Sequence, residues 1–393
     1  MNLVVVPFHD WRKSEKEGFR TRDVHFIKSL SENSNVQKLL VINRPSTWLE
    51  FLYKRQKKKL KGKVILKRGK FSLTQVAPEI FVTDYFSNDV FNQLLKKHLW
   101  FIEKYNSKGY LSFIDDSCAK LDMDTKYLIT QNIFSYKLAV KIDAKEKLFD
   151  AWDNFLKFPA YKGVKNELEN GYELLARNIS FWTTNSKENI KFFKDKFNVN
   201  YIGLVKNGVK TNFISGSSKL EIPDDLRSIK KPIIGFGGKI SYLLNYELIN
   251  YITKENPESS FVFVGQVLDK NVYEKIIKRK NVFFLGDKHY SVYPKYVQNF
   301  DICIVPYNIR EGQHGGDSIK AYEYLLTQKK VVGTKGNGLQ DLNEYIYLVD
   351  DANEFSAELK DLKNEKPFIN IEEHSWERKG NRLLEILKGY VNE

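Results

Sequence analysis

Cysteine is nearly absent from this 393-residue chain, which has only Cys118 and Cys303. Two thiols cannot build a disulfide scaffold or a four-cysteine zinc site, so the sequence indicates a reducing, cytoplasmic compartment. The six histidines show no metal-ligand spacing with these cysteines. We therefore expect no metal centre.

Long apolar runs are also missing. No stretch approaches the roughly 18 residues that a membrane-spanning helix needs. The opening segment, MNLVVVPFHDW, has no basic leader before its short apolar run. We interpret this run as a first core strand and not as a signal peptide.

Acidic residues are in deficit: 49 Asp and Glu face 63 Lys and Arg, which gives a net charge of +14. Such a surplus favours anionic partners, namely nucleic acid, an acidic membrane surface or phosphorylated small molecules. The apolar content of 42% is enough for real cores. A chain of this length and composition is expected to form two soluble globular domains.

Short β-rich runs alternate with longer helical stretches, which is typical of α/β domains with doubly wound parallel sheets. Residues 207–231 are polar and read as an interdomain linker, and residues 372–390 have the apolar spacing of a terminal helix. We predict domains at 1–206 and 207–371, with 372–393 as a helix that packs back towards the first. The predicted strands are Leu3–Pro7, Leu39–Ile42, Lys126–Thr130, Lys147–Phe149, Ser180–Thr183, Tyr201–Val205, Pro232–Phe236, Phe261–Gly265, Val282–Leu285, Asp301–Pro306, Val331–Gly333 and Tyr345–Val349.

A basic run occupies residues 54–70, with ten basic side chains and no acidic one. It can be a solvated helix-and-hairpin surface, or it can bind anionic lipid headgroups, each basic residue contributing about 1 kcal/mol near such a surface. Nucleic-acid binding is the weakest interpretation, because no RNP, zinc-finger or helix-turn-helix signature accompanies the run. Nucleic acid is therefore not an expected partner.

Loops that follow strands are the places to look for ligands, because doubly wound sheets bind them beyond the carboxyl ends of the strands. The predicted strand 301–306 leads into a glycine-containing loop and then a helix, for which Asp317 is the predicted N-cap. Free backbone N–H groups there attract phosphate, while Lys320 and Glu323 share a helix face. These two side chains suit a diphosphate and a ribose. The alternative is a capped helix with a surface ion pair. The candidates in this segment are His314, Gly315, Gly316, Lys320 and Glu323.

Glycines also follow the first two strands of the second half. Gly237, Gly238 and Lys239 come after the first, and Gly265 after the second. Glycine at this point lets the backbone cradle a phosphate, which Lys239 would neutralise. The spacing is not a full GxGxxG.

In the first half, Asp150 and Asp153 lie on one loop after a strand, where they can orient a sugar hydroxyl or act as a base. A turn or a helix cap is the alternative. Gly18, Arg20 and Arg22 follow the first strand and begin a helix. The arginines can contact phosphates or merely decorate the helix start.

Taken in order, these segments resemble the GT-B glycosyltransferases, in particular the family 4 (group 1) bacterial enzymes. The resemblance is strongest from about residue 180 onward. It rests on Val205–Val209, like the family's PNGVD hinge; Phe236–Ile240, like its Gly-Arg loop; Asn281–Gly286, like NVxFLG; Lys320–Leu325, like K-x-YEYLA; Ser375–Glu377, like SWE; and Leu148–Phe155, like the YDxxDD of enzymes that assemble surface polysaccharides.

The resemblance implies two Rossmann-like domains that face each other across a cleft, with a nucleotide-sugar in the C-terminal one. Glu323 matches the family glutamate that holds the ribose, and Lys239 stands where an arginine usually binds the diphosphate. Gly237, Gly238, Gly265, His314, Gly315, Gly316 and Lys320 would complete the donor site. Gly18, Arg20, Arg22, Asp150 and Asp153 would bind the acceptor. The catalytic candidates are Asp150, Asp153, Lys239 and Lys320.

Two departures from the family pattern stand out. Gly315 occupies the position eight residues before Glu323, where the family has its first glutamate, and Glu311 is out of register. The second basic residue, about five positions after Lys239, is replaced by Leu244 and Asn245.

The function implied by the resemblance is transfer of a hexose from a nucleotide-sugar, with UDP as the expected nucleotide, to a lipid-linked saccharide. The product would be an O-antigen, capsule or wall polysaccharide, and the anomeric configuration would be retained. No metal or other cofactor is expected, and the enzyme would act at the inner face of the cell membrane. The alternatives are a nucleotide-sugar 2-epimerase, which needs no acceptor, and a non-catalytic nucleotide-binding subunit of the same fold.

Overall fold

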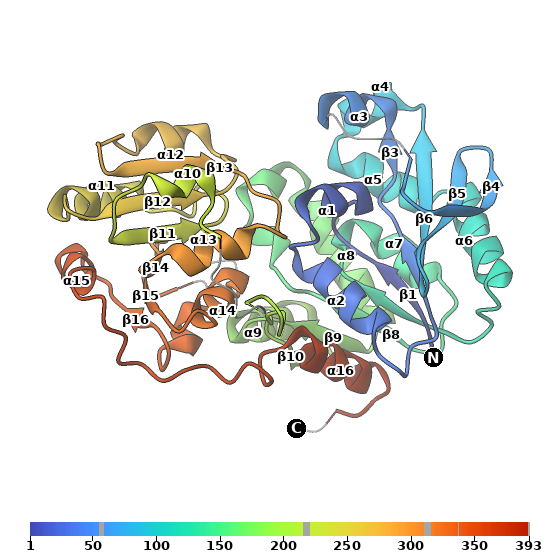
Figure 1. The fold of residues 1–393 in the computed structure, drawn as a ribbon. Coiled ribbons are helices and arrows are strands. Elements are labelled where there is room, and N and C mark those ends of the chain that lie inside the picture. The colour runs from blue at the N-terminus through green and yellow to red at the C-terminus, as the bar shows by residue number, and fades with distance from the viewer. Residues whose placement is uncertain (55–58, 215–220, 310–315, 337, 392–393) are drawn as a thin grey trace. The chain divides into compact units, whose positions relative to one another are not determined.

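The computed structural model describes residues 1–54, 59–214, 221–309, 316–336 and 338–391. The chain forms two compact units (Figure 1). Unit 1 comprises Met1–Lys206 and Lys379–Glu393, and unit 2 comprises Asn207–Arg378. Each unit is built around its own sheet.

Unit 1 contains a ten-stranded sheet in the order β10-β9-β8-β7-β1-β2-β6-β5-β4, with β3 paired to β6. Its pairs are parallel except β4–β5 and β5–β6, which are antiparallel. The strands are β1 Asn2–Val6, β2 Lys38–Ile42, β3 Ser46–Thr47, β4 Lys63–Arg68, β5 Phe71–Ala77, β6 Ile80–Ser87, β7 Lys126–Thr130, β8 Lys147–Asp150, β9 Phe181–Thr184 and β10 Tyr201–Leu204.

The central strands of this sheet are buried on both faces. Val4 and Val6 of β1 belong to the main hydrophobic core, while Leu3 and Val5 are equally buried but point the opposite way. This explains why β1 is a continuous apolar run without polar alternation, as parallel strands covered on both sides are.

Helices cover both faces of the sheet in unit 1. Gly380 of α16 lies so close to α2 that a Cβ added there would approach Ser29 Oγ to 2.6 Å. The end of the chain therefore packs against the first half (Figure 1). The helices are α1 Trp11–Glu17, α2 Arg22–Ser31, α3 Trp48–Lys54, α4 Val90–Lys96, α5 His98–Tyr105, α6 Lys108–Lys120, α7 Tyr136–Lys141, α8 Lys165–Asn178, α9 Lys187–Phe197 and α16 Trp376–Leu387, with 3-10 turns η1 Ile133–Ser135, η2 Phe155–Lys157 and η3 Pro159–Val164.

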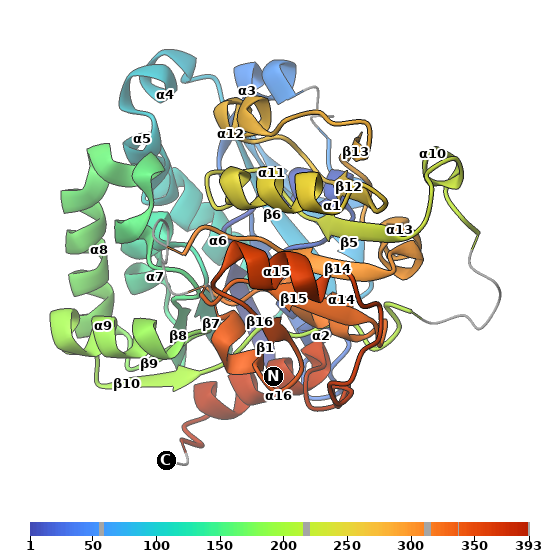
Figure 2. The same cartoon turned by 90° about the vertical axis from the view of Figure 1, so that its left-hand side faces the viewer.

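Unit 2 has a six-stranded, fully parallel sheet in the order β13-β12-β11-β14-β15-β16. Figure 2 looks onto the face covered by α11 and α15, where Asn256 Nδ2 donates to Ser356 Oγ at 2.9 Å. The elements are β11 Ile233–Gly237, β12 Ser260–Val264, β13 Val282–Gly286, β14 Ile302–Val305, β15 Lys330–Gly333, β16 Tyr347–Leu348, α10 Asp224–Arg227, α11 Tyr246–Glu255, α12 Lys270–Lys275, α13 Tyr293–Asn299, α14 Ile319–Leu325, α15 Ala352–Glu358 and the 3-10 turn η4 Leu339–Leu342.

Two predictions about connecting segments were wrong. The predicted strands include none between residues 43 and 125, yet β3 to β6 lie there. The hairpin considered for the run at 54–70 agrees with β4 and β5, whereas β3 and β6 were missed. The predicted linker 207–231 instead contributes four apolar side chains to the buried core of unit 2: Val209, Phe213, Leu226 and Ile229.

Each sheet reverses its winding direction at its first strand. In unit 1 the chain goes from β1 to β2 on one side and later returns to β7 on the other, and in unit 2 β11 is flanked by β12 and β14 in the same way. Ligands of open α/β sheets bind at the carboxyl ends of the strands at such a reversal. The loops after β1, β7, β11 and β14 are therefore the expected ligand-binding positions.

The two cysteines lie one in each unit, and both are buried. Burial raises the pKa of the Cys118 thiol to about 11 and that of Cys303 to about 12. Within the described residues, no helix combines the length and apolar character that a membrane crossing requires.

A buried ion pair joins the carboxyl ends of several strands in unit 1. Arg22 Nε and Nη2 donate to the two oxygens of Asp150 at 3.0 and 2.9 Å, and the side chains are 3% and 0% exposed. Gln131 and Thr183 donate to the same carboxylate at 2.9 and 2.8 Å. Arg22 Nη2 also donates to the Val205 carbonyl at 2.8 Å. These contacts connect the start of α2 with the ends of β7, β8, β9 and β10.

Replacing Asp150 by Ala should lower the free energy of unfolding by about 3–5 kcal/mol, because Arg22 would remain buried without its carboxylate. Urea denaturation followed by tryptophan fluorescence measures this, since five of the six tryptophans lie in unit 1. The matched control is Glu173→Ala, whose ion pair with Arg177 is 52% and 76% exposed; its change should stay within about 0.5 kcal/mol. Equal losses in both variants would contradict the role of the buried pair.

Candidate active site

Two glycine loops touch at the carboxyl edge of the sheet in unit 2. Gly265, which follows β12, has a φ of +156°, and a Cβ there would lie 1.9 Å from the Gly238 carbonyl oxygen. Gly238 N–H donates to the Val264 carbonyl at 2.8 Å. Only glycine permits this backbone approach. The fold thus brings together the predicted candidates Gly237, Gly238 and Gly265, with Lys239 half-buried in the same loop.

Lys320 reaches this glycine loop from α14. A Cβ added to Gly238 would lie 3.0 Å from Lys320 Nζ. The ammonium group donates to Tyr307 Oη and lies 5.3 Å from the centre of the Phe236 ring. The loops after β11 and β14 are also joined directly, because Asn308 N–H donates to the Leu243 carbonyl at 2.6 Å. A cation and backbone amides therefore converge where the sheet reverses its winding.

Glu323 lies about one turn further along α14 and is only 4% exposed. It accepts a hydrogen bond of 2.5 Å from Tyr290 Oη. Burial, followed by the charge of Glu323, raises the pKa of Tyr290 well above its ordinary value, so the phenol stays protonated and donates to the carboxylate. Tyr290 consequently orients Glu323. The two residues lie 33 positions apart, so no local pattern predicts this contact.

The predicted N-cap at Asp317 was wrong. The cap residue of α14 is Ser318, whose side chain makes no capping hydrogen bond. The Asp317 carboxylate instead accepts from Asn207 N–H at 2.6 Å and from Tyr322 Oη at 3.1 Å. The Asp317 carboxylate therefore binds these two partners, of which Asn207 is 110 residues away in the sequence, and not the backbone N–H groups of the first turn of α14. Gly316 is buried beside this turn.

Three residues of the predicted donor loop lie outside the described residues: His314, Gly315 and Glu311. Among the residues that the structure describes, no group of three or more His, Cys, Asp or Glu side chains is arranged to hold a metal ion.

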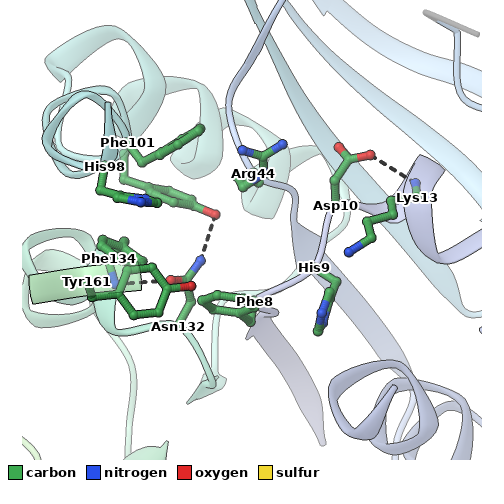
Figure 3. A pocket seen from close by; sticks show the side chains of 11 residues that line it. Phe8, His9, Asp10, Lys13, Arg44, His98, Phe101, Asn132, Phe134 and Tyr161 are labelled. Carbon is green, nitrogen blue, oxygen red and sulfur yellow. Dashed lines mark hydrogen bonds between the residues drawn. The ribbon is translucent and has the colours of Figure 1, made fainter. Parts of the chain in front are cut away.

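Unit 1 contains a pocket of about 190 Å³ at the carboxyl ends of β1 and β7 (Figure 3). One wall is aromatic: His98 stacks on Phe134 at 5.4 Å between ring centres and meets Tyr161 edge-on at 5.0 Å. The opposite wall is polar, with Arg44, Asp10 and Lys13 in the view of Figure 3. The full lining is Phe8, His9, Asp10, Lys13, Arg44, His98, Phe101, Tyr105, Asn132, Phe134 and Tyr161.

His9 in this pocket is held by Asp23. His9 Nδ1 lies 3.0 Å from Asp23 Oδ2, and His9 N–H donates to the same oxygen at 2.8 Å. Burial alone would raise the pKa of Asp23, but the His9 imidazole and hydrogen bonds from His9 and Thr21 bring it well below its ordinary 3.8. The carboxylate is therefore ionised and accepts the Nδ1 proton, which leaves Nε2 as the chemically available nitrogen.

His98 on the aromatic wall is uncharged at neutral pH. Burial, and then the charges of Arg44 and Lys97, lower its pKa below the ordinary 6.5. Arg44 is itself paired with Glu50. An aromatic wall that faces polar groups suits a sugar ring, because the C–H face of the ring stacks on the aromatic side chains while the hydroxyl groups form hydrogen bonds.

The predicted acceptor residues serve other purposes in the structure. Gly18 is the left-handed C-cap of α1 with φ +82°, and Arg20 Nε donates to Glu17 at 3.1 Å. Arg22 and Asp150 are consumed by their mutual ion pair, so Asp150 offers no exposed oxygen for direct catalysis. Asp153 is also buried, at 7% exposure. In this structure the Arg22 and Asp150 side chains are engaged by each other, and their proposed contacts with the acceptor stay predictions.

The pocket residues His9, Asp10, Lys13, Arg44, His98 and Asn132 were not among the sequence candidates. A signal was present in the sequence, since Phe8, His9 and Asp10 closely follow β1, at the carboxyl end where such sheets bind ligands.

The chain was compared with protein-family models, with curated proteins and with solved structures. No protein-family model matches the chain. A Bacillus subtilis protein named as a teichuronic acid biosynthesis glycosyltransferase, TuaH, is 26% identical over 132 residues, which is 33% of this chain and 33% of TuaH. The matched region thus spans about a third of that relative.

Solved structures match nearly the whole chain. Anabaena HepE in complex with UDP and glucose has a TM-score of 0.67 and 13% identity, covering 99% of this chain and all of HepE. The trehalose-phosphate synthase of Burkholderia xenovorans, in complex with glucose-6-phosphate, has a TM-score of 0.67 and 9% identity, covering 99% and 100%. The E. coli trehalose-6-phosphate protein bound with UDP-2-fluoro glucose has a TM-score of 0.63 and 10% identity, covering 100% and 96%. The chain has the GT-B fold.

Within this GT-B fold, the glycine loops, Lys320 and Glu323 lie in unit 2, and the aromatic pocket lies in unit 1. The predicted fold class is thereby confirmed. The roles of the predicted site residues stay predictions. The structure groups the described donor candidates Gly237, Gly238, Lys239, Gly265, Lys320 and Glu323 in unit 2.

The stabilisation that Asp23 provides should depend on pH in a defined direction. Because its pKa is lower in the folded chain than the ordinary 3.8, the stabilisation is complete above about pH 5 and is lost as the pH falls below about 4. The difference in unfolding free energy between the wild type and Asp23→Asn should therefore shrink between pH 5 and pH 3. Urea titrations at several pH values measure it, and a constant difference would contradict the His9–Asp23 interaction.

Proposed function

We propose that the protein is a glycosyltransferase that moves a hexose from a nucleotide-sugar, with UDP as the first candidate, to a lipid-linked saccharide. The observation that carries the proposal is the convergence of the Gly238 loop, Lys320 and Glu323 where the sheet of unit 2 reverses. Its support from comparison is that HepE was solved with UDP and glucose and the E. coli protein with UDP-2-fluoro glucose.

The proposed donor site uses charge and backbone amides. Lys320 and Lys239 would neutralise the diphosphate, which accumulates negative charge as its bond to the anomeric carbon breaks. The close approach of Gly238 and Gly265 leaves room for phosphate oxygens beside the backbone. Glu323, oriented by Tyr290, would accept hydrogen bonds from ribose hydroxyls. No metal or cofactor is assigned a role in this proposal.

The proposed acceptor site is the pocket of unit 1. A sugar ring would stack on Phe134 and Tyr161, while Lys13 and Arg44 would bind its oxygens. His9 Nε2 would hold the attacking hydroxyl, because Nδ1 is engaged by Asp23. Retention at the anomeric carbon, implied by the family resemblance, is part of the proposal.

The proposed pathway is synthesis of a cell-surface polysaccharide at the inner face of the membrane. Support comes from the name of TuaH, which refers to teichuronic acid biosynthesis. The basic run at 54–70 supports contact with anionic lipid, although residues 55–58 of it lie outside the described residues.

A thermal-shift screen with UDP, GDP, dTDP, ADP, CMP and their common sugars tests the donor site. A ligand at a hundred times its Kd stabilises the folded chain by about 2.7 kcal/mol, so the melting temperature should rise with one nucleotide class. Lys320→Ala should weaken that ligand about tenfold to a hundredfold, because a charge-assisted hydrogen bond is lost. Lys254→Ala, which removes an exposed lysine from α11, is the control and should bind normally. No shift with any nucleotide would sink the proposal.

Truncation of the aromatic wall tests the acceptor site. Tyr161→Ala should lower kcat/KM for hexose transfer to polyprenyl-diphosphate-linked saccharides about tenfold, because stacking area is lost, while nucleotide affinity stays unchanged. Tyr390→Ala, at a tyrosine that is 65% exposed in unit 1, is the control. Conversion of the nucleotide-sugar without any acceptor would point to epimerisation and would overturn the assignment of this pocket.

A further inference from the structure

The strands β11 and β14 separate near their carboxyl ends, where the sheet of unit 2 reverses its winding. β11 pairs with β14 at two positions, Ile234 with Ile302 and Gly235 with Cys303. On its other side, β11 stays paired with β12 as far as Gly237. Among the described residues of β14, none pairs with Gly237. The two strands thus part at the point where open α/β sheets bind ligands.

The hydroxyl group of Tyr324 takes the place of the missing strand partner. Gly238 N–H donates to the Val264 carbonyl of β12 at 2.8 Å, so the preceding Gly237 N–H points to the opposite side, towards β14. There it donates to Tyr324 Oη at 2.6 Å, and Tyr324 Oη donates to the Gly237 carbonyl at 3.1 Å. One side-chain hydroxyl thereby satisfies both backbone groups that a neighbouring strand would satisfy.

The surroundings of Tyr324 keep this contact in place. The side chain is 0% exposed, so water does not compete for its hydroxyl. Burial raises the pKa of Tyr324 well above its ordinary value, so the phenol keeps the proton that it donates. Tyr293 Oη lies against the same glycine, since a Cβ at position 237 would come within 2.1 Å of it. A side chain at position 237 is therefore excluded.

Helix α14 reaches two consecutive glycines from one face. Lys320 and Tyr324 are four residues apart on this helix, so they project in the same direction. Tyr324 holds Gly237, and a Cβ on Gly238 would lie 3.0 Å from Lys320 Nζ. Glycine has the widest conformational freedom of all residues, so a loop with two of them needs an external contact to keep one conformation. Tyr324 supplies that contact beside the cation.

We propose that Tyr324 is a positioning residue for the diphosphate of the nucleotide-sugar. Its hydroxyl holds Gly237 so that the Gly238 backbone and Lys320 meet the phosphate oxygens in a preorganised arrangement. The inference rests on the donor site of the proposed function and assigns a role within it. Glu323, the adjacent residue of α14, is proposed to bind the ribose with the help of Tyr290. Two neighbouring side chains of one helix then act on two different parts of the nucleotide.

The affinities of UDP and uridine distinguish these two parts. Tyr324→Phe keeps the ring and removes only the hydroxyl, so it should weaken UDP about tenfold and leave uridine unchanged, because uridine has no phosphate. Tyr290→Phe should weaken both ligands by the same factor, because both contain the ribose. The matched control is Tyr251→Phe, which removes a hydroxyl that bonds to Asn353, and it should bind both ligands like the wild type. Calorimetry measures UDP, and competition against UDP measures uridine.

Hydrogen exchange of the ligand-free protein tests the contact itself. In Tyr324→Phe, the Gly237 amide loses its acceptor, so it should exchange about tenfold faster than in the wild type. Exchange in β13, which does not contact this hydroxyl, should stay the same. Mass spectrometry of peptides that cover β11 and β13 measures both rates. An unchanged rate at the end of β11 would overturn the positioning role.

The binding data separate failure of this inference from failure of the proposed function. If the wild type prefers UDP over uridine and Tyr324→Phe keeps that preference in full, the positioning role is overturned and the donor site stands. An equal loss of UDP and uridine affinity in Tyr324→Phe would indicate a general structural role and would also overturn it. A wild type that binds UDP no more tightly than uridine would overturn the proposed donor site, and this role with it.

Discussion

The carboxyl edge of the sheet in unit 1 depends on the buried pair of Arg22 and Asp150. Through Gln131, Thr183 and the Val205 carbonyl, this pair sets the ends of four neighbouring strands relative to the start of α2. The pocket opens on the same edge, and α2 also carries Asp23, which holds His9. The ion pair is therefore a positioning element. It ties the start of α2 to the strand ends beside the pocket.

In unit 2, backbone groups and tyrosine hydroxyls position the loops at the carboxyl edge of the sheet, where unit 1 uses a buried charge pair. Tyr324 Oη donates to the Gly237 carbonyl at 3.1 Å, and Tyr290 holds Glu323. The helix α14 thus reaches the glycine loops through several side chains at once. Because these contacts join segments that are 33 to 87 residues apart, the local geometry of the proposed donor site follows from the tertiary fold.

The sequence predicted the parallel strands of both sheets, except β3 and β6, to within about two residues, because strands buried on both faces read as unbroken apolar runs. It also predicted the grouping of Gly238 and Lys320, since loops after adjacent parallel strands must meet at one edge. The sequence-based prediction failed for side chains whose hydrogen-bond partners lie far away in the sequence. The Asp317 carboxylate accepts hydrogen bonds from Asn207 and Tyr322 and does not cap α14, and the Asp150 carboxylate accepts from Arg22. Nothing in the local pattern distinguishes such residues from exposed ones of the same type.

The location of the cysteines has a practical consequence for spectroscopy. With pKa values near 11 and 12, the buried thiols of Cys118 and Cys303 are almost fully protonated at neutral pH, and the protonated form is a poor nucleophile. The native chain is therefore close to a cysteine-free background. A thiol introduced on the surface of either unit can be alkylated selectively with a spin label or a fluorophore, without removing a single native residue.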